Sequence, residues 1–132
     1  MKPIMQDNQL FEYAIIRVVP RVEREEFLNV GVIVYCSSQQ FLQTVFTLDE
    51  LRLTALFPEV NVEEVRDHLR AFERISEGKE DAGPIAGLDM ASRFRWLTAR
   101  RSTVLQTSPV HPGLCKNAGD TIKQLHQQLV VC

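Results

Sequence analysis

The sequence has few of the features that mark secreted, membrane-spanning or zinc-binding proteins. Its three cysteines are odd in number, lie far apart and form no CxxC pair, so no disulfide framework is expected. No apolar run approaches the roughly 20 residues of a membrane span, and residues 1–10 lack the apolar region of a signal peptide. We therefore expect a cytoplasmic protein that does not associate with membranes.

Motifs of the common enzyme classes are missing as well. The chain contains no Walker loop, no GxGxxG, HExxH or GxSxG segment, and no set of cysteines and histidines at metal-ligand spacing. These absences lower the odds of nucleotide, zinc or hydrolase chemistry, although they leave open a site assembled across strands. The sequence accordingly predicts no catalytic residue, no metal and no cofactor.

The length and net charge of the chain limit the number of domains and the kinds of partner to expect. The 132 residues fit one domain, and a chain of this size can bury a substantial core. The formal net charge of −2 gives no global attraction to nucleic acid or to anionic membranes. We expect a single domain over residues 1–132, with a loose polar segment at residues 1–9.

Two β-rich runs, residues 11–19 and 29–35, flank a charged connection and predict a pair of antiparallel strands. Both faces of the first run are apolar, so this strand should be central and covered on both sides. Arg17 then lies in an apolar row. We place it opposite Gly31, where the missing side chain would leave room for the guanidinium. Alternatively, Arg17 extends to solvent at a strand end and Gly31 is a plain bulge.

Four helices are predicted in the rest of the chain. The clearest begins at Asn61, an N-cap residue followed three positions later by a glutamate, and it carries an apolar stripe at helical spacing. Shorter helices are predicted over residues 48–57 and 88–97, and the last helix begins near Asn117 or Asp120.

Residues 41–47 and 102–110 predict two more strands, which complete an antiparallel sheet of about four strands. Residues 108–113 contain two prolines and predict a rigid, turn-rich loop. The predicted fold class is α+β, with the helices packed on one face of the sheet.

The first candidate site consists of Arg17, Glu26 and Asn29. Asn29 should lie beside Arg17 on one face, and Glu26 lies just before the second strand. A buried arginine with a carboxylate and an amide can hold an anion. The same three groups can also simply satisfy one another, since buried pairs often serve only to fix an arrangement.

The second candidate site is the only basic cluster, at residues 93–101, with Arg93, Trp96, Arg100 and Arg101 as its candidate binding residues. Arginine and aromatic side chains suit phosphate contact and base stacking, and the same residue types dominate protein interfaces. In the other interpretation the aromatic residues are core anchors, and the arginines pair with acidic residues between positions 77 and 81. We expect Arg93 and Arg100 to be the more exposed arginines.

A third candidate pairs His111 with Cys115. A cysteine and a histidine can act as nucleophile and base. However, the sequence offers no oxyanion donor or orienting acid for them, and the neighbouring prolines favour a structural loop.

Several segments are similar to a known family. Tyr-Ala-Ile-Ile-Arg-Val-Val-Pro (13–20), Glu-Phe-Leu-Asn-Val-Gly-Val (26–32), Trp-Leu-Thr-Ala-Arg-Arg-Ser (96–102) and Ser-Pro-Val-His (108–111) resemble the bacterial domain-of-unknown-function family 3037. The resemblance covers nearly the whole chain, and the EFxNVG segment is its most specific part. It implies a small single-domain bacterial protein and carries over no catalytic residue. It also implies a protein partner of the HipA-like kinase class, whose genes neighbour some members.

These observations lead to two hypotheses of different classes. The first is a non-catalytic protein-interaction or regulatory module. The second is a phosphate- or nucleic-acid-binding protein, or an enzyme, that uses Arg17 and the basic cluster. Salt-dependent binding to oligonucleotides would favour the second hypothesis, whereas co-purification of a stoichiometric protein would favour the first.

Overall fold

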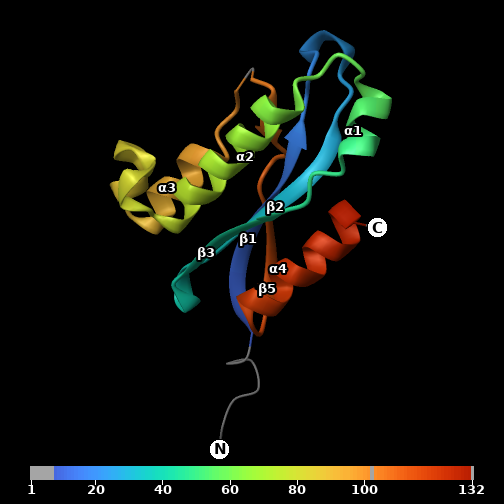
Figure 1. Ribbon diagram of the computed structural model, residues 1–132. Coiled ribbons are helices and arrows are strands. Elements are labelled where there is room, and N and C mark those ends of the chain that lie inside the picture. The colour runs from blue at the N-terminus through green and yellow to red at the C-terminus, as the bar shows by residue number, and fades with distance from the viewer. Residues whose placement is uncertain (1–7, 102, 132) are drawn as a thin grey trace, which may run out of the picture.

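The computed structural model describes residues 8–101 and 103–131, and within them the chain forms one five-stranded antiparallel sheet. The strands are β1 (Gln9–Val18), β2 (Leu28–Cys36), β3 (Phe41–Phe46), β4 (Leu105–Thr107) and β5 (His111–Cys115). Their order is β3-β2-β1-β4, and β5 pairs with β1 as well (Figure 1). The α+β class is therefore confirmed, with one strand more than predicted.

Each α-helix begins within about two residues of its predicted start. The helices are α1 (Glu50–Leu56), α2 (Val62–Glu77), α3 (Met90–Leu97) and α4 (Ala118–His126), and a π-helical turn (Gln127–Val131) follows α4. In each α-helix the side chain of the N-cap residue accepts a hydrogen bond from the backbone N–H three positions later. These caps are Asp49, Asn61, Asp89 and Asn117.

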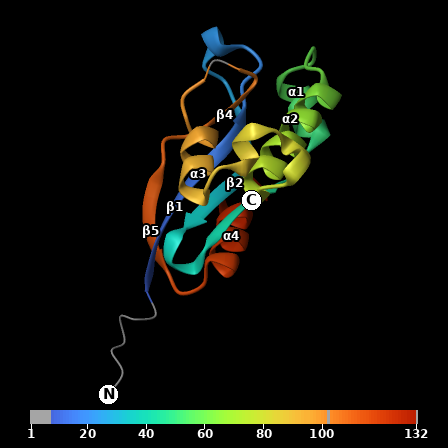
Figure 2. The ribbon, with the colours of Figure 1, turned by 90° about the vertical axis from the view of Figure 1, so that its left-hand side faces the viewer.

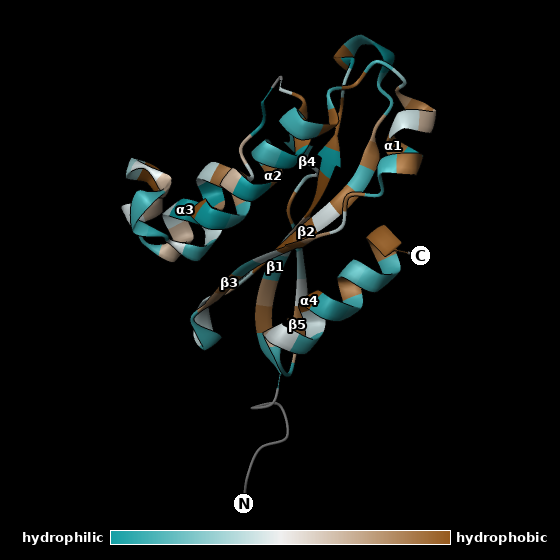
Figure 3. Cartoon of the chain, viewed as in Figure 1, coloured by the Kyte–Doolittle hydropathy of each residue, from teal (hydrophilic) through white to brown (hydrophobic). Residues whose placement is uncertain are grey.

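Helices cover both faces of the sheet, not the single face expected. Helices α1, α2 and α3 enclose one apolar cluster, which contains Ile16, Ile33, Leu53, Leu69 and Phe94. Helix α4 encloses a second cluster on the opposite face, which contains Phe11, Val32, Val34 and Ile122 (Figure 2). Figure 3 shows apolar residues along the central strands and mostly polar residues on the outer side of α2. The predicted coverage of β1 on both sides is thus confirmed.

The pairing of β1 with β2 differs from the predicted register by one residue up to Ile16 and by two residues at Arg17. Gly31 lies opposite Ile16, and an irregularity between Ile16 and Arg17 leaves one extra residue in β2, so that Arg17 lies opposite Asn29. A Cβ atom on Gly31 would come within 2.8 Å of the Val45 carbonyl oxygen. Close approach of β3, and not room for Arg17, therefore explains the glycine.

The predicted strand at residues 102–110 is shorter and is followed by a further strand. Position 102 lies outside the described residues. Strand β4 contains only the three residues Leu105–Thr107. The segment predicted as a turn-rich loop contains the start of β5. Strand β4 pairs with the C-terminal part of β1, and β5 pairs with its N-terminal part.

The predicted loose segment falls mostly on residues 1–7, which lie outside the described part of the chain. Its last residue, Gln9, already belongs to β1. Among the described helices, none combines the length and the apolar character that crossing a membrane requires.

Candidate binding groove beside helix α2

An apolar hollow of about 250 Å³ lies between α2, α3 and the segment that leads into β4. We call it the Trp96 hollow. Helix α2 contributes Phe72 and Ile75, α3 contributes Trp96 and Leu97, and Leu105 of β4 lies on the other side. The hollow exists because the short helix α3 packs against α2 with Phe94 and Leu97, which are buried, and leaves Trp96 at the rim.

Trp96 and Arg101 form one unit at the rim of this hollow. The Trp96 side chain remains 39% exposed, and the guanidinium carbon of Arg101 lies 3.9 Å from the centre of its ring. Arg101 also donates a hydrogen bond to the Trp96 carbonyl oxygen. Partial burial lowers the pKa of Arg101 from its ordinary value. The contact is a cation–π interaction between two of the predicted site residues.

Two other arginines of the basic cluster bind to groups of the chain itself. Arg93 is half-buried and donates a hydrogen bond to the Leu88 carbonyl oxygen at 2.6 Å, so the expectation that it is exposed is wrong. Arg95 forms two hydrogen bonds with the Glu12 carboxylate, at 2.8 and 3.0 Å, and this pairing raises the pKa of Arg95. Arg100 is exposed and makes no hydrogen bond or ion pair within the described residues.

The predicted trio of Arg17, Glu26 and Asn29 does not form one site. The guanidinium carbon of Arg17 lies 4.1 Å from the centre of the Phe27 ring. Glu26 is exposed and forms an ion pair with Arg24 at 2.7 Å. Only Arg17 and Asn29 remain neighbours, since they lie opposite each other in the β1–β2 pair.

Arg17 and Asn29 make no hydrogen bond with each other, and the space beside them is small. The Asn29 amide donates a hydrogen bond to the Leu129 carbonyl oxygen at 3.3 Å and so connects β2 to the π-helical turn that follows α4. Arg17 Nε and Asn29 Oδ1 are buried without a hydrogen bond among the described residues, and one is a donor and the other an acceptor. The hollow beside Asn29 has a volume of about 80 Å³, far below the several hundred Å³ of a typical organic ligand site.

His111 and Cys115 lie on the same strand but in different environments. His111 is exposed, and its ring centre lies 5.3 Å from that of Tyr13. Cys115 is buried, and burial raises the pKa of its thiol. A thiol held in its protonated form is a poor nucleophile. The arrangement therefore does not favour a cysteine–histidine catalytic pair.

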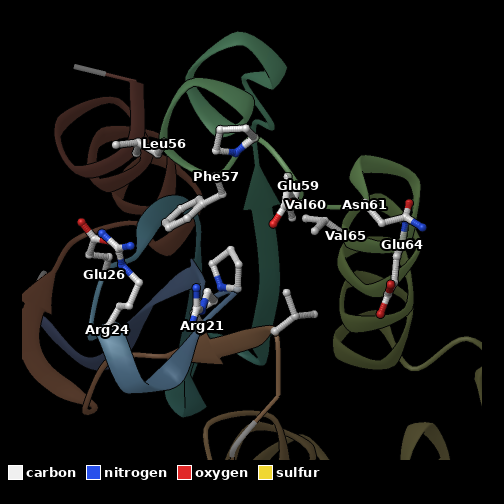
Figure 4. A pocket seen from close by; sticks show the side chains of 13 residues that line it. Arg21, Arg24, Glu26, Leu56, Phe57, Glu59, Val60, Asn61, Glu64 and Val65 are labelled. Atoms are coloured by element: carbon white, nitrogen blue, oxygen red, sulfur yellow. The ribbon is translucent and has the colours of Figure 1, made fainter.

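Sequence reasoning missed a larger hollow, of about 500 Å³, at the N-terminal end of α2 (Figure 4). We call it the Phe57 hollow. Its walls come from the β1–β2 connection, the α1–α2 connection and the first turns of α2, with Leu56, Phe57, Val60, Val65 and Val104 as its apolar lining. The signal in the sequence is weak: two prolines, Pro20 and Pro58, end the flanking elements, and both line the hollow.

At the rim of the Phe57 hollow the arginines have ion-pair partners, whereas some of the carboxylates do not. Its cations are satisfied locally, because Arg21 lies 3.6 Å from Glu23 and Arg24 lies 2.7 Å from Glu26. Among its carboxylates, Glu26 is the partner of Arg24, whereas Glu59 makes no ion pair with a described residue and Glu64 lies 4.0 Å from His68. Within the described residues, no group of three or more histidine, cysteine or acidic side chains is placed to hold a metal ion.

The fold and these hollows define a small α+β domain with two surface depressions along one helix. Residues 13–130 match the family described as "Protein of unknown function (DUF3037)", and the chain belongs to this family. This match confirms the resemblance drawn from the sequence segments. No curated protein and no solved structure matches the chain.

Proposed function

We propose that this protein is a non-catalytic interaction module, and that it binds a segment of a partner protein in the Trp96 hollow. The observation that supports this function is the half-exposed Trp96 ring, held by Arg101 at the edge of an apolar hollow. Tryptophan and arginine are the residue types that most often dominate binding energy at protein interfaces.

The size of the hollow favours a peptide side chain over a free small molecule. At about 250 Å³ it lies below the range of roughly 300–1,000 Å³ that is common for small-molecule sites. One or two apolar side chains of a partner would fill it. The Arg101 stack fixes the tryptophan ring, so that little conformational entropy is lost when a partner covers the ring.

The second candidate function is phosphate or nucleic-acid binding at the same basic cluster. It is favoured by the exposed Arg100 and by the stacked Trp96–Arg101 pair, because aromatic and arginine side chains are typical platforms for bases. It ranks second because Arg93 and Arg95 are already bound to groups of the chain itself.

We further propose that the protein works in the bacterial cytoplasm and that its partner is a HipA-like kinase. The kinase follows from the family resemblance alone. The compartment is supported by Cys36 and Cys115, which are buried as free thiols and therefore suit a reducing environment.

Affinity capture with the wild-type protein and with Trp96→Ala tests the proposal. The captured protein is identified, purified and titrated against both baits, and we expect Trp96→Ala to weaken its binding at least tenfold. Leu114→Ala, which removes a 68% exposed side chain on β5, is the control and should bind normally. Equal binding by the wild type and Trp96→Ala would refute the Trp96 hollow as the interface. Salt-dependent binding to oligonucleotides would instead support the second candidate.

A further inference from the structure

The two hollows are connected along helix α2. The Phe57 hollow takes Asn61, Glu64 and Val65 from this helix, and the Trp96 hollow begins at His68. A shallow depression that contains Glu64 and His68 joins them. On the opposite wall, consecutive residues of the chain line both hollows, since Val104 lies in one and Leu105 in the other. The result is one groove with an apolar hollow at each end.

The groove has a surplus of negative charge between the Phe57 hollow and its middle. Glu59, in the lining of the Phe57 hollow, makes no ion pair with any described residue, and Glu64, which also borders the joining depression, has only His68, at 4.0 Å, as a partner. Asp67 lies 3.9 Å from Arg70, at the limit of an ion pair. Since the arginines at the far rim are already paired with glutamates, these carboxylates are available to a cationic partner.

The length of the groove fixes the spacing of the groups that would fill it. The α2 residues in the two hollows are centred about eight positions apart, which corresponds to about 12 Å along a helix. An extended peptide covers this distance in roughly four residues, at about 3.3 Å per residue. Residues of α2 and β4 contact each other, so we take the occupant to be an extended chain, which is slimmer than a helix of about 10 Å diameter.

We propose that the groove binds an extended basic segment of a partner protein, with two apolar side chains four residues apart. One anchor would enter the Phe57 hollow and the other the Trp96 hollow. A lysine or arginine midway between the anchors points to the same side as the anchors, because side chains alternate along an extended chain, and would face Glu64 and Asp67, with Glu59 beside the first anchor. This inference rests on the proposed function, because it assumes that the Trp96 hollow is the site of partner binding.

Synthetic peptides test the inference, and the protein supplies its own reporter because Trp96 is the only tryptophan in the chain. The probe is acetylated Leu-Ser-Lys-Ser-Phe carrying a fluorophore at its C-terminal end, read by anisotropy and, without the fluorophore, by Trp96 emission. The control probe is Leu-Ser-Glu-Ser-Phe. We expect the lysine peptide to bind at least tenfold more tightly, with a change in Trp96 emission, and the preference to shrink as salt rises.

Charge-reversed proteins complete the test. Glu59→Lys with Glu64→Lys should weaken the lysine peptide at least tenfold and improve the glutamate peptide. The matched control is Glu77→Lys with Glu80→Lys, which reverses two exposed carboxylates outside both hollows and should change neither affinity. Circular dichroism and the melting temperature establish that every variant folds.

The outcomes separate this inference from the proposed function. If both peptides bind equally and still change Trp96 emission, the basic partner is refuted, whereas the Trp96 hollow stands as a binding site. If neither peptide binds the wild type at millimolar concentration, the two-anchor inference is refuted, and the capture experiment with Trp96→Ala decides the proposed function independently.

Discussion

Ser108 satisfies both backbone hydrogen-bonding groups of Ile15 at the point where the chain passes from β4 to β5. Its amide N–H donates to the Ile15 carbonyl oxygen at 2.8 Å, and its Oγ accepts from the Ile15 N–H at 2.9 Å. The next residue, Pro109, has no N–H to offer to a strand ladder. One buried serine thus keeps the edge of β1 hydrogen-bonded across the break between two strands.

We predict that Ser108→Ala lowers the free energy of unfolding by about 1–3 kcal/mol, because the partly buried Ile15 N–H loses its acceptor. Chemical denaturation of both proteins measures the difference. Ser37→Ala, which removes an exposed hydroxyl, is the control and should change stability by less than about 0.5 kcal/mol. Equal stabilities of the wild type and Ser108→Ala would show that another group accepts this hydrogen bond.

Gly31→Ala should also destabilise the protein, by about 1–3 kcal/mol, because the new methyl group would collide with β3. Its Cβ would lie 2.8 Å from both the Val45 carbonyl oxygen and the Phe46 Cβ, and neither atom belongs to the flexible end of a side chain. Gly87→Ala is the control, since no atom lies within 4 Å of the added Cβ. A thermal melt of the three proteins tests the expectation, and an unchanged melting temperature for Gly31→Ala would contradict it.

The sequence predicts the helices well because their start signals are local. Asn61 and Asn117 cap their helices through the N–H three residues later, which a linear pattern reveals. The strand register depends instead on partners far along the chain. The pairing is offset by one residue up to Ile16, the extra residue in β2 near Asn29 adds a second, and no pattern within either strand predicts these shifts.

In the candidate site, too, local contacts could be predicted from the sequence and long-range contacts could not. Trp96 and Arg101 lie five residues apart, so their association within one cluster could be predicted from the sequence. The other wall of the Trp96 hollow comes from α2, about twenty to thirty residues earlier in the chain, and the partner of Arg95 is Glu12 on β1. Such long-range contacts depend on how the helices pack on the sheet, which short-range patterns do not specify.

Replacing Arg17 by methionine should cost less stability than replacing it by alanine. The side chain lies in a mostly apolar environment beside Phe27, and its Nε is buried without a hydrogen bond. Methionine keeps the contact with the ring through its flexible apolar chain, whereas alanine leaves a gap. Denaturation midpoints of both variants provide the measurement. If methionine is as damaging as alanine, the charge of Arg17 is what matters.

His126 gives the protein a predictable pH response. Its Nε2 lies 2.9 Å from Thr47 Oγ1, at the contact between α4 and the end of β3, and burial lowers the pKa of His126 from its ordinary value of 6.5. The unfolded chain therefore binds a proton at a higher pH than the folded chain does. It follows that the free energy of unfolding falls as the pH drops below the pKa of His126 in the unfolded chain. The fall ends once the pH is below the pKa of His126 in the folded chain.

We predict that His126→Gln reduces this loss of stability between pH 7 and about pH 5.5, because glutamine can keep a hydrogen bond to Thr47 without taking up a proton. Urea denaturation of the wild type and the variant at several pH values measures the difference in slope. His68→Gln, which removes an exposed imidazole, is the matched control and should retain the His126 contribution. The prediction is wrong if the wild type and His126→Gln lose stability in parallel over this range. Carboxylates that titrate at lower pH do not affect the comparison, because both proteins contain the same set.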